Sequence, residues 1–277
     1  MESMISRRLF LSSLATAVAT ALTIPSILIY IARGPSKPGQ AVRDKEIYAV
    51  GKGYIDLPAP MLDGGVSVES ALANRRSIRE YLDEPLTLDE LSQILWASYG
   101  VSETIYGFKT TPSAGATYPL NIYAVIYPGG VIIPEGKALA EGSYIYEPHS
   151  HRLRLVRAGD LSSELYRVCV NQEWVLKAKA VLVFTAVYER TTNRYGERGV
   201  RYVWIEVGHA GQNVYLQATS LGLATVAIGA FYDDELRKLI GAGDNEHPLY
   251  VMPIARPAWR YRLRREDLIS YIAKHRS

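Results

Sequence analysis

The sequence predicts an α+β domain whose sheet is mixed or antiparallel and is flanked by helices. Three observations support this fold class. Helical and strand-like segments interleave between residues 67 and 254, but without the strict strand–helix–strand order of a parallel sheet. Several apolar runs have the length of a buried strand. A Thr-x-x-Glu capping box marks the start of a helix.

Two helices are expected at the beginning of the domain. A short helix covers residues 67–73. The second begins at the capping box Thr87-Leu88-Asp89-Glu90, in which the threonine and glutamate side chains each accept a backbone N–H. Leucines at helical spacing then share one face, and Gly100 ends the helix.

The rest of the domain is predicted as alternating strands and helices. Strands are expected at residues 121–127, 152–157, 180–188, 224–228 and 249–254. Helices are expected at residues 160–170, 171–177, 203–221 and 233–240, with Gly222 placed just past the third of them.

Composition excludes some classes of protein. The net charge of +3 over 277 residues is far below the basic excess of a protein whose main partner is nucleic acid. Cys169 is the single cysteine and lies between two valines, which predicts a buried thiol rather than a nucleophile. His149 and His151 would share a strand face, but no third ligand is near them in sequence, so no metal site is predicted.

The N-terminus has the features of an export signal. Arg7 and Arg8 directly precede an apolar run from Leu9 to Ala32, which is typical of a twin-arginine signal. The run is also long enough to remain as a hydrophobic anchor helix. We therefore expect a signal or membrane anchor at residues 1–33, a linker at 34–46 and the folded domain at 47–277, on the extracytoplasmic side of the membrane.

An arginine-rich segment, Asn74-Arg75-Arg76-Ser77-Ile78-Arg79, follows the first predicted helix. Guanidinium groups bind phosphate and carboxylate through two parallel hydrogen bonds, and a serine hydroxyl adds another donor. The segment therefore predicts an anion site, with a solvated basic helix end as the alternative.

A second segment is suited to close contact with a flat ligand. Pro112-Ser113-Ala114-Gly115-Ala116-Thr117-Tyr118-Pro119 consists mainly of small residues and leads into the predicted strand at 121–127. The sequence contains neither a G-x-G-x-x-G loop after a strand nor a G-x-x-x-x-G-K-[ST] loop. A nicotinamide cofactor, if used, would therefore bind only transiently.

These two segments occur in order with two others, Ile205–Asn213 and Gly222–Phe231. The ordered set resembles the nitroreductase superfamily of FMN-dependent enzymes, and most closely its SagB-type dehydrogenase branch. The resemblance covers about residues 70–256. It implies a nitroreductase-like fold and a homodimer with FMN at the subunit interface.

The resemblance also implies roles for individual residues. Contacts to the FMN phosphate and pyrimidine are implied for Arg75, Arg76, Ser77 and Arg79. Contacts to the isoalloxazine ring are implied for Pro112, Ser113, Ala114 and Gly115. Ile228 and Gly229 match the backbone cradle on the flavin face. Arg256 matches a C-terminal phosphate-binding position, although Ala255 stands where relatives commonly carry glycine; the alternative is one more charge in a basic stretch with Arg260, Arg262, Arg264 and Arg265.

Proton transfer is the remaining question of the predicted site. Arg194 and Tyr195 occupy what resembles the position of a Lys-Tyr pair in azoline-oxidising members of the SagB branch. Arginine is a poor general base, which argues against azoline oxidation, but Tyr195 can donate a proton. The alternative is that both decorate a surface loop. His209 is expected to pack or to form a hydrogen bond rather than to act in catalysis, and Glu206 to orient an arginine or face a subunit boundary.

Taken together, these features predict an FMN-dependent oxidoreductase that transfers hydride through flavin N5 to a small organic acceptor such as a nitroaromatic or a quinone. Because NAD(P)H is scarce outside the cytoplasm, export predicts either a reduced membrane carrier such as a quinol as the donor or the dehydrogenation of a substrate with electrons passed outward; a nicotinamide donor is the other alternative. The alternatives are a dehydrogenase of peptide-derived azolines and a non-catalytic, membrane-tethered flavin-binding protein.

Overall fold

The protein is described by a computed structural model that places residues 53–276. The predicted signal or anchor (residues 1–33) and linker (34–46) lie outside the described residues. Within residues 53–276, no helix combines the length and apolar character needed to cross a membrane.

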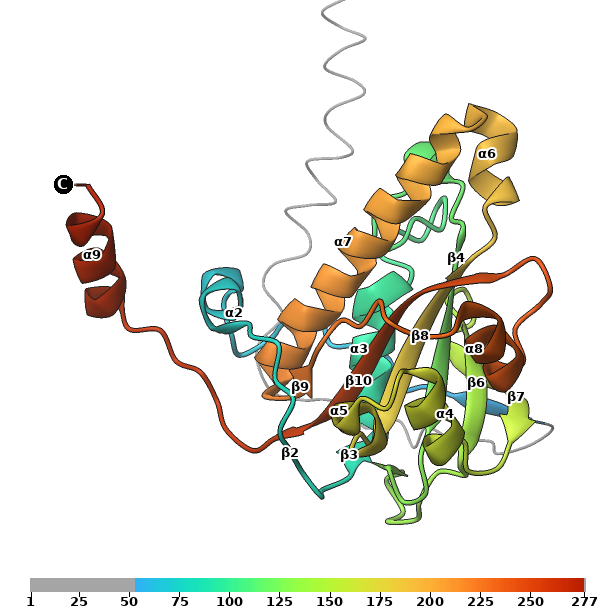
Figure 1. The fold of residues 1–277 in the computed structure, drawn as a ribbon, viewed down its shortest axis with the longest axis horizontal. Helices are drawn as coiled ribbons and strands as arrows, with labels where there is room; N and C mark the ends of the chain where they lie inside the picture. Colours follow the sequence, from blue (N-terminus) through green and yellow to red (C-terminus); the bar gives the residue numbers. More distant parts are fainter. Residues whose placement is uncertain (1–52, 277) are drawn as a thin grey trace, which may run out of the picture. The chain divides into compact units, whose positions relative to one another are not determined.

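The centre of the domain is an antiparallel sheet, as the sequence predicts (Figure 1). In spatial order its strands are β1 (Tyr54–Asp56), β7 (Arg152–Ala158), β6 (Gly142–Glu147), β4 (Leu120–Ile126), β8 (Ala180–Ala186), β10 (His247–Pro257) and β2 (Tyr81–Leu82), and β9 (Ala224–Thr225) also pairs with β10. Every pairing in this sheet is antiparallel. Two short strands, β3 (Leu86–Thr87) and β5 (Val131–Ile132), form a separate parallel pair.

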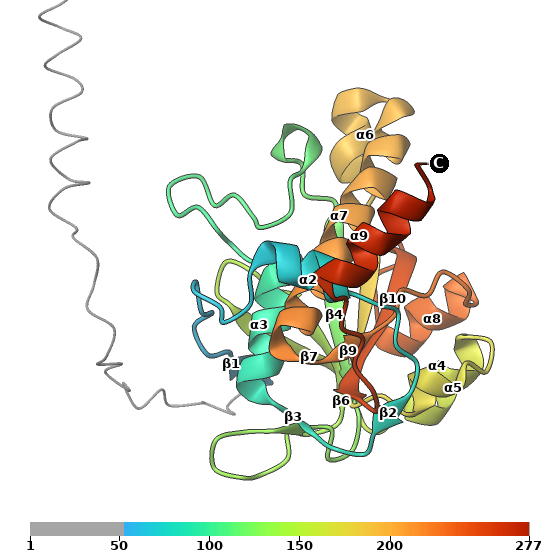
Figure 2. The ribbon, with the colours of Figure 1, turned by 90° about the vertical axis from the view of Figure 1, so that its left-hand side faces the viewer.

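Helices cover both faces of the sheet (Figures 1 and 2). One face carries α3 (Leu88–Tyr99) and α7 (Arg198–Leu221); the other carries α4 (Ser162–Val168), α5 (Glu173–Leu176) and α8 (Asp233–Ile240). Strand β4 serves both layers because its side chains alternate. Ile122 and Ala124 belong to the core under α3 and α7, and Tyr123 and Val125 to the core under α4 and α8.

Helices α2 (Val68–Asn74) and α6 (Glu189–Tyr195) lie at the margins of these layers, and α9 (Arg265–Lys274) stands apart from them at the end of the C-terminal segment (Figure 1). None of the residues of α9 is buried. The segment before α9 does contact α2, because the Leu263 N–H donates to Asn74 Oδ1 over 2.8 Å.

The predicted helix signals are present in the structure. The Thr87 N–H donates to Glu90 Oε2 at 2.8 Å, and the Glu90 N–H donates to Thr87 Oγ1 at 3.2 Å, which completes the capping box of α3. Gly100 is the C-cap of α3. Gly222 ends α7 in a left-handed conformation, with φ of 70°.

Some predicted boundaries are wrong. Helix α7 begins at Arg198 rather than at residue 203. The earlier start was missed because the first turn carries two exposed arginines, Arg198 and Arg201, and a buried glycine, Gly199, instead of an apolar stripe. The strand expected at 224–228 is only Ala224–Thr225, since Ile228 pairs with Val251 by an isolated bridge. Arg194 and Tyr195 belong to helix α6, not to a loop.

Candidate functional site

Tyr215 of α7 connects two of the predicted cofactor-binding segments. Its hydroxyl lies 2.8 Å from Ser77 Oγ, and the Ala227 N–H donates to the same hydroxyl over 2.8 Å. The Arg75 guanidinium lies 5.0 Å from the centre of its ring. The structure therefore brings Arg75 and Ser77 together with the segment that contains Ile228 and Gly229. A Cβ at Gly229 would meet open space, so a flat ring can approach the backbone there.

A cavity of about 310 Å³ adjoins this cluster, between α2, the end of α7 and the segment after β10. The described residues that line it include three guanidinium groups, those of Arg76, Arg260 and Arg262, and no carboxylate. Arg76 stacks on the Tyr261 ring with its central carbon 3.6 Å from the ring centroid. Such a cavity favours an anion, and planar guanidinium groups suit phosphate.

Buried polar atoms next to the arginine segment also lack partners. Among the described residues, three buried side-chain atoms have no hydrogen-bond partner: Tyr81 Oη, Trp174 Nε1 and Thr225 Oγ1. The Trp174 ring lies 5.2 Å from the Arg79 guanidinium, Tyr81 is two residues from Arg79, and Thr225 lines the arginine-lined cavity. Unpaired buried polar groups are rare in folded proteins, and a bound polar ligand would explain such a group here. The residues present therefore fit FMN, whose phosphate would enter the cavity.

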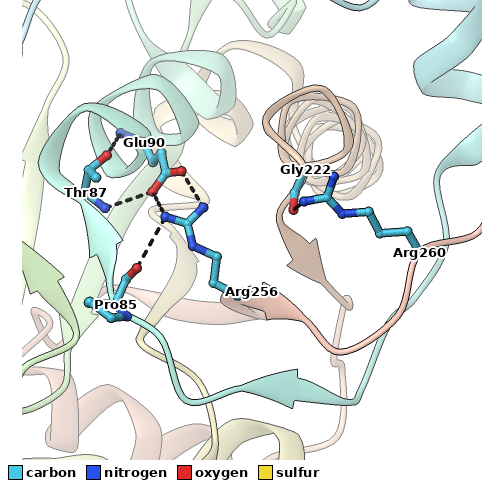
Figure 3. A network of polar contacts seen from close by, with 6 residues as sticks. All are labelled: Pro85, Thr87, Glu90, Gly222, Arg256 and Arg260. Carbon is cyan, nitrogen blue, oxygen red and sulfur yellow. Dashed lines mark hydrogen bonds and ion pairs between the residues drawn. The ribbon is translucent and has the colours of Figure 1, made fainter.

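Arg256 is placed differently from the sequence prediction (Figure 3). Its guanidinium forms a bidentate ion pair with Glu90, with N···O distances of 2.6 and 2.9 Å, and the same carboxylate caps α3. The guanidinium that lies beside Gly222 is that of Arg260, which donates to the Gly222 carbonyl over 3.2 Å. Arg256 is thus held by a structural partner, and its predicted contact with phosphate has no support in this arrangement.

Arg260 and Arg262 were treated in the sequence only as part of a basic stretch. The cavity is lined by three consecutive residues of this stretch, Arg260, Tyr261 and Arg262, and nothing in the basic stretch itself distinguished these arginines from their neighbours. Tyr215 had no signal in the sequence either, because its role depends on contacts with residues 77 and 227.

The small-residue loop and the Arg194-Tyr195 pair form a second cluster. Arg194 donates from Nη1 to the Gly115 carbonyl over 3.1 Å. Gly115 has φ of 58°, and a Cβ there would lie 2.4 Å from the Tyr195 hydroxyl, so a side chain would be excluded. Ser113 Oγ accepts from the Tyr118 N–H at 2.9 Å. Pro112, Ser113 and Ala114 line a cavity of about 250 Å³ with residues of α7.

The two clusters lie at opposite ends of α7 (Figure 1). The first cluster lies around Tyr215 and Gly222, next to α2 and β9. The second lies around Tyr202 and Glu206, next to α6. Tyr215 lies nine positions after Glu206 in α7, which corresponds to about 13 Å along the helix axis. Apart from Arg79, which lies over Trp174, and Arg256, which pairs with Glu90, the predicted site residues therefore form two groups in one chain rather than one pocket.

Comparison with known proteins identifies the family. The model of the nitroreductase family matches residues 72–256. The chain belongs to the nitroreductase family. It is 48% identical over 191 residues to a protein of Methanocaldococcus jannaschii that is named as a nitroreductase, an alignment that covers 69% of this chain and 91% of that protein. It is therefore an oxidoreductase with the nitroreductase fold, as predicted from the resemblance.

More distant relatives are consistent with this membership. The chain is 26% identical over 204 residues to the trifolitoxin operon protein of Rhizobium leguminosarum bv. trifolii, covering 70% of this chain and 54% of that protein. A solved structure from Ralstonia eutropha JMP134 that is described as a nitroreductase superposes with a TM-score of 0.65 at 29% identity, covering 75% of this chain and 91% of that one. The SagB-type branch remains a prediction.

Proposed function

We propose that this nitroreductase-family enzyme binds FMN and passes electrons from a donor to a small organic acceptor such as a quinone or a nitroaromatic. The observation that carries the proposal is the cavity lined by Arg76, Arg260 and Arg262, beside the unpartnered hydroxyl of Thr225. Bound FMN would supply hydride chemistry at its N5 atom.

The chain's own residues would hold and tune the cofactor. Arg76, Arg260 and Arg262 would neutralise the phosphate, and the Thr225 hydroxyl would gain a partner. Arg75 and Ser77, fixed by Tyr215, would meet the pyrimidine side of the ring. A guanidinium near that side stabilises negative charge on the reduced ring and so raises its reduction potential.

The separation of the two clusters supports a homodimer. The two clusters lie about 13 Å apart along α7, and two copies related by a twofold axis can bring the arginine cluster of one chain next to the loop of the other. Exposed apolar side chains are available for such an interface. Trp204 and Ile205 of α7 are 59% and 49% exposed, and Leu268, Ile269, Tyr271 and Ile272 of α9 are exposed as well.

The cofactor is tested by spectroscopy of the purified protein. We expect a yellow protein whose chromophore is released on denaturation, identified as FMN, and bleached reversibly by dithionite. A colourless protein that does not take up added FMN would contradict the proposal and would favour a role without flavin.

The electron donor is tested by stopped-flow reduction with NADPH and with a soluble quinol in parallel. We propose that the twin-arginine segment directs the enzyme to the extracytoplasmic side, where nicotinamide donors are scarce, so the quinol should reduce the enzyme faster. Efficient reduction by NADPH alone would argue against this location and donor. Fractionation of cells that produce the full chain tests the location directly.

A further inference from the structure

A buried carboxyl group lies under the small-residue loop. Glu206 of α7 is 2% exposed and accepts a hydrogen bond of 2.5 Å from the Tyr99 hydroxyl at the end of α3. The Tyr99 hydroxyl in turn accepts from the Leu120 N–H over 3.3 Å. The sequence suggested that Glu206 orients an arginine or faces a subunit boundary, but its hydrogen bonds come from Tyr99 and from Ser113 of the loop. Tyr99 and Leu120 therefore fix the position of the carboxyl group without neutralising it.

Glu206 also forms part of the wall of the 250 Å³ cavity, together with Pro112, Ser113 and Ala114 of the loop and Tyr202 and His209 of α7. The loop side of this cavity is the part of the chain that the family resemblance places beside the flavin ring. The volume suits one small ring rather than a large substrate. An acceptor in this cavity would lie next to a carboxyl group that is otherwise shielded from water.

Lys109 completes the cluster. Its Nζ atom lies 3.9 Å from the centre of the Tyr99 ring and 4.6 Å from the centre of the Tyr118 ring. Burial lowers the pKa of Lys109 to about 8, an effect that the Glu206 charge opposes and the Arg190 charge supports. Lys109 therefore places a positive charge near Glu206 at neutral pH.

The ionisation of Glu206 depends on this environment. Burial raises the pKa of Glu206, whereas hydrogen bonds from Ser113 and Tyr99 and the charge of Lys109 oppose the rise. The net shift is upward, which favours a protonated carboxyl closer to neutral pH than an exposed glutamate would allow.

We propose that Glu206 donates a proton to the acceptor in this cavity, and that Tyr99 and Lys109 are positioning residues that set its ionisation. The inference rests on the proposed function. A quinone that becomes a quinol gains two electrons and two protons: a hydride brings both electrons and one proton, and Glu206 supplies the second. The resulting carboxylate recovers its proton from water after product leaves.

The first experiment substitutes Glu206→Gln, which keeps the shape of the side chain and removes the acid. With the enzyme reduced by dithionite and reoxidised by a soluble benzoquinone, we expect the wild-type rate to fall as pH rises through the pKa of Glu206. In the Glu206→Gln variant the rate should be about 100-fold lower, and it should no longer fall as pH rises. Glu246→Gln is the matched control, because Glu246 is also buried and also accepts from a tyrosine, Tyr123, but does not line the cavity.

The second experiment tests Lys109 by a readout that does not need turnover. Infrared difference spectra of wild type minus Glu206→Gln, recorded on protein without flavin across a pH series, follow the protonated carboxyl directly. Lys109→Met removes a positive charge, so the Glu206 midpoint and the fall in rate should both move to higher pH. Substitution of the exposed Lys137→Met should move neither.

The outcomes separate this inference from the proposed function. If the wild-type protein takes up FMN but Glu206→Gln keeps the pH-dependent fall, the inference is wrong and the proposed function stands. If Lys109→Met leaves the titration midpoint of Glu206 unchanged, Lys109 has no positioning role. If the wild-type protein takes up no FMN, both fail.

Discussion

Tyr215 shows how one side chain organises a site whose parts are far apart in sequence. Its hydroxyl contacts Ser77 and the Ala227 N–H, and its ring lies under Arg75. The arginine segment alone could not distinguish a cofactor site from a solvated helix end. What distinguishes them is the tyrosine between that segment and residue 227.

Replacing Tyr215→Phe should keep the ring under Arg75 but leave the Ala227 N–H without its acceptor. We expect a loss of about 1–3 kcal/mol in the free energy of unfolding, measured by urea denaturation, together with weaker FMN retention. Tyr232→Phe is the control, because Tyr232 is 53% exposed. Equal losses in the two variants would contradict the role of the Tyr215 hydroxyl.

Cys169 offers a second test at the scale of the residue. The predicted burial is confirmed, since Cys169 is 0% exposed, and burial raises the pKa of its thiol to about 12. We therefore expect almost no reaction with a thiol reagent at pH 8 in the native protein and one reactive thiol per chain in denaturant. Fast labelling of the native protein would show that the core between α4 and α8 opens.

At the scale of the element, the end of β10 separates two arginine roles. Arg256 on β10 is paired with Glu90 of α3, whereas Arg260 and Arg262 beyond the strand line the cavity. Arg256→Ala should therefore lower the free energy of unfolding by about 1–3 kcal/mol and leave FMN affinity nearly unchanged. Arg260→Ala and Arg262→Ala should lower FMN affinity and leave the free energy of unfolding nearly unchanged. Denaturation curves and FMN titration of all three variants check this, and a flavin defect confined to Arg256→Ala would restore the original prediction for that residue.

Elements were predictable where their signals are local. The capping box of α3 and the glycine after α7 act within one turn, so both boundaries could be predicted from a few residues. The start of α7 could not, because its first turn carries no apolar stripe. Strand β6 was missed as well. It begins with Gly142-Ser143, and Ser143 is buried because its hydroxyl donates to the Ile240 carbonyl of α8, a contact that only the folded chain provides.

The same division applies to the candidate site. The arginine segment and the small-residue loop were recognised as motifs, and Arg194 and Tyr195 do contact that loop at Gly115. Arg260, Arg262, Tyr215 and Lys109 were not recognised, since each acquires its neighbours through tertiary packing. Arg256 was chosen by position along the chain, but Glu90, 166 residues away, determines where its guanidinium lies.

At the scale of the whole molecule, the length of α7 links fold to assembly. The C-terminal end of α7 lies at the arginine-lined cavity. The N-terminal part contains Glu206 and lies beside the small-residue loop and α6. If FMN binds between two copies, each of its two sites combines the arginine cluster of one subunit with the loop of the other. This arrangement predicts a specific result when two defective variants are combined.

The first variant, Arg260→Ala with Arg262→Ala, lacks the phosphate contacts but keeps the loop. The second, Ala114→Trp, places a bulky side chain on the loop that is predicted to contact the isoalloxazine ring but keeps the arginines. Each homodimer should lose FMN at both sites. In a heterodimer one site receives both lesions and the other receives none, so co-expression with two affinity tags should yield a heterodimer that holds about one FMN. A heterodimer of wild type with the chain that carries all three substitutions should hold none, because each site then receives one lesion. If each site were built within a single chain, the first heterodimer would be empty and the second would hold one FMN, and the cofactor content measured after denaturation decides between the two assemblies.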